Sequence, residues 1–154
     1  MLPQALQDVI EALGHLPGVG ARTAERYAYY LFKSSPRIST EIAETLVNLH
    51  NGVKSCPVTF ALIDADEEVS PLYNDPTRDK STILVVEEPL DIYAIEQTKQ
   101  FKGTYHVLGG AISPIDGITA DQLHIKELLA RIEPDNVQEI IIATNPSVEG
   151  ESTA

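Results

Sequence analysis

The fold of this chain is constrained most by the alternation of apolar runs and helical patterns that begins at residue 81. The runs STILVVEE, GTYHVLGG and VQEIIIATN cover residues 81–88, 103–110 and 137–145, and each has the length of a strand. Helical patterns over residues 90–97 and 119–132 separate these runs. Such alternation is typical of parallel strands with covering helices, so residues 81–154 are predicted to form an α/β domain.

The carboxyl ends of these strands form one rim of the predicted sheet, where ligands gather in open parallel sheets. Glu87, Glu88 and Asp91 follow the first strand, and residues 145–149 follow the third. The three carboxylates could hold Mg²⁺ for phosphoryl transfer, or they could cap a helix or face solvent, and the residues leave both interpretations open. Catalysis is the weaker prediction, because the third strand delivers Ala-Thr-Asn-Pro instead of further carboxylates.

The N-terminal third has a purely helical pattern. Apolar residues at three-and-four spacing predict helices over residues 3–13, 21–33 and 40–51, the last with Ser39 as its cap. Between the first two helices lies LPGVG, in which Gly18 and Gly20 permit a sharp turn, so the pattern is helix-hairpin-helix. The residues expected on the inner face of the second helix are Ala24, Tyr27, Ala28 and Leu31.

The LPGVG turn has the features of a phosphate-binding site. Its backbone amides and the N-terminus of the following helix both present partial positive charge. Arg22 and Arg26 lie four residues apart on one helical face and can reach flanking phosphates without reading base edges, so any binding should be independent of sequence. The alternative is a simple turn between helices beside a solvated basic face, and the residues alone do not decide between the two.

The charge of the chain is distributed unevenly. The formal net charge of −12 argues on average against a nucleic-acid partner, because affinity for phosphates comes from Lys and Arg. Residues 1–55 carry five basic and five acidic side chains, so the whole excess of negative charge lies in residues 56–154. Residues 18–37 carry four basic side chains and one acidic side chain. We therefore expect any contact with DNA in that segment.

Several classes of protein and of site are excluded by the sequence. No stretch approaches the ~20 apolar residues of a membrane helix, and the N-terminus lacks a signal-peptide pattern, so we expect a cytoplasmic protein with no membrane partner. The one cysteine, Cys56, has no second thiol for a disulfide and is expected to be a small buried residue or a free thiol. Residues 53–80 contain three prolines and the acidic run DADEE, and they are predicted to form a small irregular module.

Several blocks occur together in one order: LPGVGARTAERYAYYL, SCPVT, SPLYNDPTRDKSTILVVEEPLDIYAIE, YHVLGGAISPIDGI and IIIATNPSVEGESTA. In this order they resemble the RecR family of bacterial recombination mediators over essentially the whole chain. The resemblance implies an α+β multidomain protein: a helix-hairpin-helix domain over 1–52, a zinc-finger module over 53–80 and an α/β Toprim domain over 81–154. It also implies action in recombinational repair at gapped or single-stranded DNA, with RecO-like and RecF-like partners and a ring-like homo-oligomer when full length.

This sequence departs from the family's zinc-finger motif. The family has two C-x-x-C pairs, and the corresponding positions here hold Cys56, Thr59, Ser70 and Tyr73. Three of the four ligands are absent, so no zinc and no other cofactor is expected. The route of the chain through the module is expected to be kept by apolar packing in place of the ion. The packing residues are Phe60, Leu62, Ile63 and Leu72.

The Toprim motifs are matched in part. Glu87 and Asp91 match the first acidic motif, while Asn145 and Glu149 stand at the second, which the family alters to TNPSVEG. Strand cleavage is therefore not implied, and these residues are expected to form a rim that faces a partner or DNA. The family continues beyond residue 154, so we expect a fragment with an open sheet edge at residues 137–145 and no oligomerisation through its Toprim end.

The leading hypothesis is a non-enzymatic mediator that binds single- or double-stranded DNA without sequence preference. The residues expected to bind DNA are Gly18, Gly20, Arg22 and Arg26. One rival is a Mg²⁺-dependent phosphoryl-transfer enzyme of Toprim type that uses Glu87 with Asp91. Another rival is an interaction scaffold that has lost DNA binding.

Overall fold

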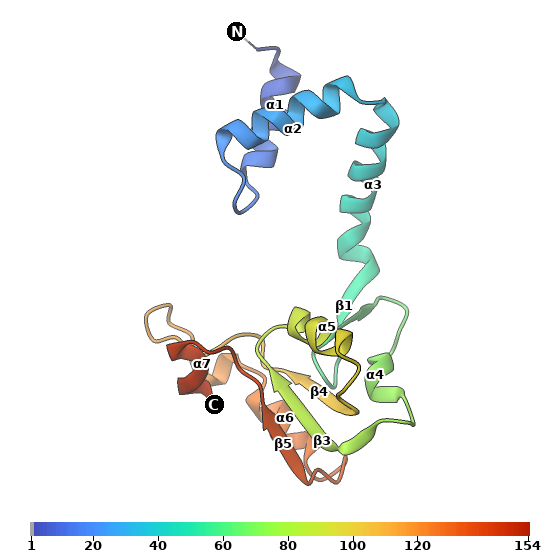
Figure 1. Cartoon of the computed structure of the whole chain (residues 1–154), viewed down its shortest axis with the longest axis vertical. Coiled ribbons are helices and arrows are strands. Elements are labelled where there is room, and N and C mark those ends of the chain that lie inside the picture. Colours follow the sequence, from blue (N-terminus) through green and yellow to red (C-terminus); the bar gives the residue numbers. More distant parts are fainter. Residues whose placement is uncertain (1) are drawn as a thin grey trace. The chain divides into compact units, whose positions relative to one another are not determined.

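The structure is a computed structural model that describes residues 2–154 (Figure 1). The chain divides into two compact units, with the boundary between His50 and Asn51. The first unit is helical and the second contains all five strands of the described residues. No helix within residues 2–154 is long and apolar enough to cross a membrane.

The first unit contains α1 (Gln4–Gly14), α2 (Ala21–Lys33) and all but the last two residues of α3 (Pro36–Gly52). The predicted bounds of α2 are confirmed, and α1 begins one residue later than predicted. Ala24 and Ala28 of α2 are the buried residues of these helices, and their small side chains allow α1 to approach closely. The prediction that Tyr27 lies on the inner face is wrong. Its side chain is 43% exposed, and its ring lies beside the exposed Arg26 guanidinium, 5.5 Å from the ring centroid.

The start of α3 also differs from the prediction. The helix begins at Pro36 rather than at residue 40, so Ser39 lies inside it and is not its cap. Proline favours the first helical position because its fixed φ suits a helix and its missing amide hydrogen needs no acceptor there. The hydroxyl of Ser35 accepts from the Arg37 amide at 3.4 Å, so Ser35, and not Ser39, caps the N-terminus of α3.

The second unit is built on a three-stranded parallel sheet, as the sequence predicts. Its strands are β3 (Asp79–Val86), β4 (Gly103–Val107) and β5 (Glu139–Ile142), in the order β4-β3-β5. Side chains of β3 alternate between two apolar clusters, so the sheet is covered on both faces. Leu84 and Val86 pack with Ile92 of α5 (Pro89–Gln97), and Ile83 and Val85 pack with Leu128 of α6 (Ile125–Arg131). The two helices cover opposite faces of the sheet (Figure 1).

The predicted helix over residues 119–132 is interrupted. A short 3₁₀ helix, η1 (Ala120–Gln122), is followed by α6, and Leu123 between them is extended and buried. The interruption has a tertiary cause: the amide of His124 donates to the carbonyl of Leu108, just after β4, at 2.9 Å. This bond ties the segment to the sheet and prevents a continuous helix.

The module over residues 53–80 is more regular than expected. The strands β1 (Val53–Ser55) and β2 (Leu62–Asp64) form an antiparallel pair, followed by α4 (Pro71–Asn74). The carbonyl of Thr59 accepts from the Val107 amide at 2.8 Å, so the module contacts β4. Phe60, Ile63 and Leu72 are buried or half-buried, as expected. Leu62 is 54% exposed, so the prediction that it packs in place of the ion is wrong.

The C-terminal edge of the sheet is formed by β5, which pairs with β3 on one side. Ile140, Ile141 and Ile142 are 37%, 38% and 51% exposed. The edge strand expected at residues 137–145 is therefore apolar and exposed. Beyond it, α7 (Val148–Thr153) completes the described elements.

Candidate nucleic-acid interface

The turn between α1 and α2 is exposed, as a ligand-binding function requires. Gly18 has φ +80°, a conformation that side-chain-bearing residues rarely adopt, so glycine is needed there for the turn itself. Gly20 has an ordinary φ of −80°, and a Cβ added to it would meet no atom within 4 Å. The fold of the chain therefore does not require glycine at residue 20, and the missing side chain leaves the surface open.

The amides of this turn are available to a ligand. The Val19 amide donates to the carbonyl of Leu16 at 3.1 Å. Within residues 2–154, the amides of Gly18, Gly20, Ala21 and Arg22 donate no hydrogen bond. Free amides at the start of a 13-residue helix present a concentration of partial positive charge.

Two guanidinium groups flank these amides. Arg22 and Arg26 are both exposed and lie on α2, one turn of helix apart. All ion pairs of the described residues lie beyond residue 74, so neither arginine is neutralised within that part of the chain. The structure thus brings together Gly18, Gly20, Arg22 and Arg26, the four residues predicted to bind DNA.

The acidic rim of the sheet has a different organisation. Glu87 is buried, and its two carboxylate oxygens accept from the backbone and side-chain amides of Asn145, at 2.8 and 2.7 Å. The carboxylate of Asp91 accepts from the Glu88 amide at the start of α5, at 2.9 Å. Glu149 is exposed on α7. The structure therefore joins Glu87 to Asn145 and leaves Asp91 and Glu149 outside this contact.

The Glu87–Asn145 contact positions the segment that leads into α7. Gly150 of this helix is buried, and a Cβ there would lie 2.8 Å from a carboxylate oxygen of Glu87 and would clash with the Asn145 carbonyl. The carboxylate therefore acts as a clamp between the end of β3 and α7. Within residues 2–154, no three His, Cys, Asp or Glu side chains gather in the way a metal site needs.

The four positions that correspond to zinc ligands hold a hydrogen-bonded core. Cys56 is a buried free thiol, and its sulfur accepts from the amides of Thr59 at 3.4 Å and Ser70 at 3.3 Å. Burial raises the pKa of Cys56, but these hydrogen bonds outweigh that effect and the net pKa lies below its ordinary value. Tyr73 turns its hydroxyl to Asp135, at 2.6 Å. With one thiol and no imidazole, these side chains do not fit a zinc site.

Asp135 belongs to a buried network that the sequence analysis missed. Arg131 is 6% exposed and donates to Asp135 at 3.1 Å, to the Tyr105 carbonyl at 2.7 Å and to the Thr104 hydroxyl at 3.1 Å. Burial, followed by the bond to Asp135, raises the pKa of Tyr73 to about 12. The only signal in the sequence was the four-residue spacing of Arg131 and Asp135, which is equally common in exposed pairs.

Two family models match this chain, one in the helical first unit and one in the second unit with the parallel sheet. Residues 6–50 match the family model described as RecR, helix-hairpin-helix, and residues 81–154 match the Toprim domain model. The first match covers the exposed turn with its arginines. The second covers the parallel sheet and the acidic rim.

Similar proteins span the whole chain. The recombination protein RecR of Streptomyces avermitilis is 46% identical over 154 residues, which are 100% of this chain and 76% of that protein. RecR of Frankia casuarinae is 46% identical over 97% of this chain and 74% of its own length. RecR of Tropheryma whipplei is 44% identical over 100% of this chain and 77% of its own length. The chain therefore belongs to the RecR family of recombination proteins, with a helix-hairpin-helix unit followed by a Toprim domain.

Proposed function

We propose that this chain is a non-enzymatic mediator of recombinational repair that binds DNA through the turn between α1 and α2. One observation carries the proposal: amides and two guanidinium groups that have no hydrogen-bond or ion-pair partner within residues 2–154 are exposed together in a segment of net positive charge. The turn amides and the α2 N-terminus would hold one phosphate, and Arg22 and Arg26 would hold its neighbours. Because these contacts reach only the backbone of DNA, binding would not depend on its sequence.

The acidic charge of the second unit supports a role in which the first unit binds DNA and the second binds a partner protein. All of the excess negative charge lies in residues 56–154, which would keep this unit away from DNA and favour a partner with a basic surface. The resemblance to the family suggests RecO-like and RecF-like proteins as these partners. Glu149 is exposed and could make such a contact. The buried Glu87 would not touch the partner itself but would hold Asn145 in position through its hydrogen bonds.

The same clamp favours a mediator over a phosphoryl-transfer enzyme. Metal-dependent transfer needs carboxylates with oxygens free to coordinate Mg²⁺. Both oxygens of Glu87 already accept hydrogen bonds, and Asp91 holds the start of α5. We therefore expect no cleavage or nicking of bound DNA in Mg²⁺.

Direct binding measurements test the proposal. Fluorescence anisotropy with a gapped duplex should show binding at low ionic strength that weakens steeply as salt rises, because each phosphate contact releases counterions. Duplexes of different sequence should bind alike. Absence of binding to gapped, single-stranded and duplex DNA at low salt would favour the scaffold without DNA binding.

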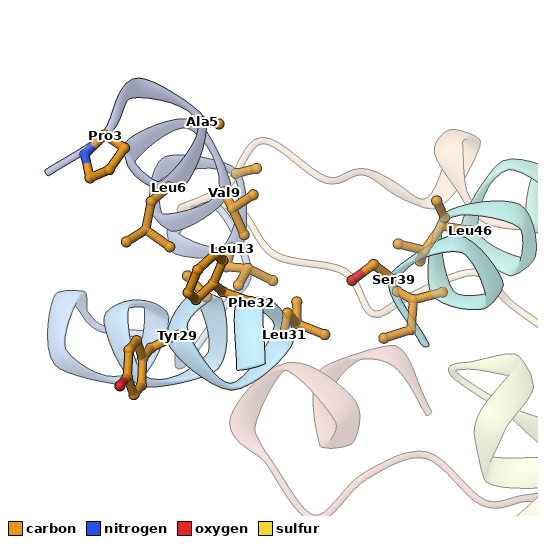
Figure 2. Close-up of a pocket in the computed structure, with 14 residues that line it drawn as sticks. Pro3, Ala5, Leu6, Val9, Leu13, Tyr29, Leu31, Phe32, Ser39 and Leu46 are labelled. Atoms are coloured by element: carbon orange, nitrogen blue, oxygen red, sulfur yellow. The ribbon is translucent and has the colours of Figure 1, made fainter. Parts of the chain in front are cut away.

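We further propose that the helical unit pairs with a second copy of the chain. α1, α2 and α3 line an apolar groove of about 670 Å³, with Leu31 on one side and Leu46 on the other (Figure 2). Phe32 and Leu46, which line it, are 77% and 62% exposed, so the unit lacks the buried core that a stable domain needs. The oligomer implied by the family resemblance would supply the missing cover.

The native mass tests this pairing. We expect light scattering to give a mass at least twice the 16.8 kDa of one chain. Leu46→Asp should return the mass toward that of one chain, because a carboxylate in the apolar groove would be desolvated without a partner. A monomeric wild-type protein would contradict the pairing and would leave DNA binding untouched.

We propose, finally, that the module over residues 53–80 folds without zinc. The buried Cys56 sulfur already accepts two amide hydrogen bonds, and Tyr73 is anchored to Asp135. These contacts would connect the loops of the module in the way that a metal ion connects them in zinc proteins.

Chelation tests this prediction. A chelator should leave the thermal midpoint of unfolding unchanged, and metal analysis should find no stoichiometric zinc. A matched variant, Thr59→Cys with Ser70→Cys and Tyr73→Cys, should bind zinc and become sensitive to the chelator. A fall in the midpoint of the wild-type protein on chelation would show that a metal holds the module.

A further inference from the structure

Tyrosine side chains stand beside the two arginines of α2. Arg22, Arg26 and Tyr30 follow one another at intervals of four residues, so they share one face over about 12 Å of helix. Tyr30 is 62% exposed, and Tyr27, which is 43% exposed, lies against the guanidinium of Arg26. We call these four residues the basic–tyrosine patch.

The fold of the chain does not explain the two tyrosines. The tyrosine hydroxyls that form hydrogen bonds within residues 2–154 are those of Tyr73 and Tyr105. Tyr29 and Phe32 line the apolar groove of the helical unit, but Tyr27 and Tyr30 do not. The Tyr30 ring is therefore mostly exposed and its hydroxyl has no hydrogen-bond partner in the described residues, while the Tyr27 ring is half covered and lies against the Arg26 guanidinium.

An exposed aromatic ring beside a guanidinium group suits an unpaired nucleotide. The ring offers a stacking surface to any base, and the guanidinium binds the adjacent phosphate. A duplex cannot use the ring, because its bases already stack on one another inside the helix. The patch thus complements a single strand in both charge and shape.

We propose that the basic–tyrosine patch is a subsite for single-stranded DNA, with phosphates on Arg22 and Arg26 and an unpaired base stacked on Tyr30. Tyr27 acts as a positioning residue, because its ring holds the Arg26 guanidinium by a cation–π contact. The proposal rests on DNA binding by α2 and adds the residue that distinguishes unpaired from paired strands.

Substitution of Tyr30 tests the subsite. We expect Tyr30→Ala to weaken binding of an oligo-dT strand roughly tenfold and to change the affinity for a duplex of equal length by less than about twofold. Tyr30→Phe should bind like the wild-type protein, because the ring is kept. Tyr93→Ala, which removes a 69% exposed tyrosine from α5, is the matched control and should change neither affinity.

The outcomes separate this proposal from DNA binding itself. If the wild-type protein binds oligo-dT and Tyr30→Ala binds it equally well, the stacking subsite is wrong and the DNA-binding function stands. Equal weakening for strand and duplex would overturn the discrimination by Tyr30. If the wild-type protein binds neither DNA, both proposals fail.

A spectroscopic test reports stacking directly. The chain has no tryptophan, so Tyr30→Trp places a single tryptophan on α2, whose emission can be excited selectively over that of the remaining tyrosines. Its emission should be quenched by oligo-dT and much less by an abasic strand of equal length, which carries the same phosphates without bases. Equal quenching by both strands would overturn base stacking. Emission that responds to protein concentration but not to DNA would identify the patch as a protein interface instead.

Discussion

Replacing Arg22 and Arg26 together by alanine is expected to weaken DNA binding about a hundredfold at low ionic strength. Each guanidinium–phosphate hydrogen bond contributes roughly 1.5 kcal/mol, and every ~1.4 kcal/mol corresponds to a factor of ten. The variant should also lower the salt dependence of binding, by roughly one in the logarithmic slope for each phosphate that is no longer bound. Titrations of one gapped duplex at several salt concentrations measure both quantities.

The control variant removes two positive charges from the second unit instead of from α2. Lys102 and Lys126 are exposed on the second unit, and their double alanine variant changes the net charge by the same amount. Its binding should follow that of the wild-type protein closely. Equal losses of affinity in the two double variants would mean that net charge, and not the α2 site, governs affinity.

Replacing Arg131 by methionine is expected to destabilise the second unit by about 3–5 kcal/mol, the usual cost of removing one partner of a buried ion pair. Asp135, whose side chain is 6% exposed, would lose its guanidinium partner. The Tyr105 carbonyl and the Thr104 hydroxyl would lose their donor as well. Denaturant unfolding followed by circular dichroism gives the free energy.

An exposed ion pair provides the comparison. Lys126 contacts Asp121 at 2.9 Å with both side chains about 80% exposed, so Lys126→Met should leave the unfolding midpoint unchanged. A similarly small effect for Arg131→Met would contradict the structural role of the buried network.

The parallel sheet could be predicted because its signal is local. Each apolar run is a strand in the structure, and the two faces of β3 follow from simple alternation between Ile83 and Val86. The interruption of the predicted helix over residues 119–132 could not be predicted in the same way. Leu123 and His124 leave the helical conformation because the Leu108 carbonyl, 16 residues earlier, accepts the His124 amide.

The candidate site likewise contains local features that could be predicted and long-range contacts that could not. The LPGVG turn and the spacing of Arg22 and Arg26 are local features, and their exposure agrees with the pattern. The clamp between Glu87 and Asn145 joins residues 58 apart, and the bond between Tyr73 and Asp135 joins residues 62 apart. Such pairs depend on the packing of separate elements, about which a single sequence carries little signal.

Mapping of amide resonances by NMR would test most directly whether DNA meets the turn and α2. On addition of oligo-dT, the amides of Gly18, Gly20, Ala21 and Arg22 should shift together with those along the exposed face of α2, while the amides of the Toprim rim stay in place. Shifts confined to the rim around Glu87 and Asn145, with an unchanged turn, would contradict this account.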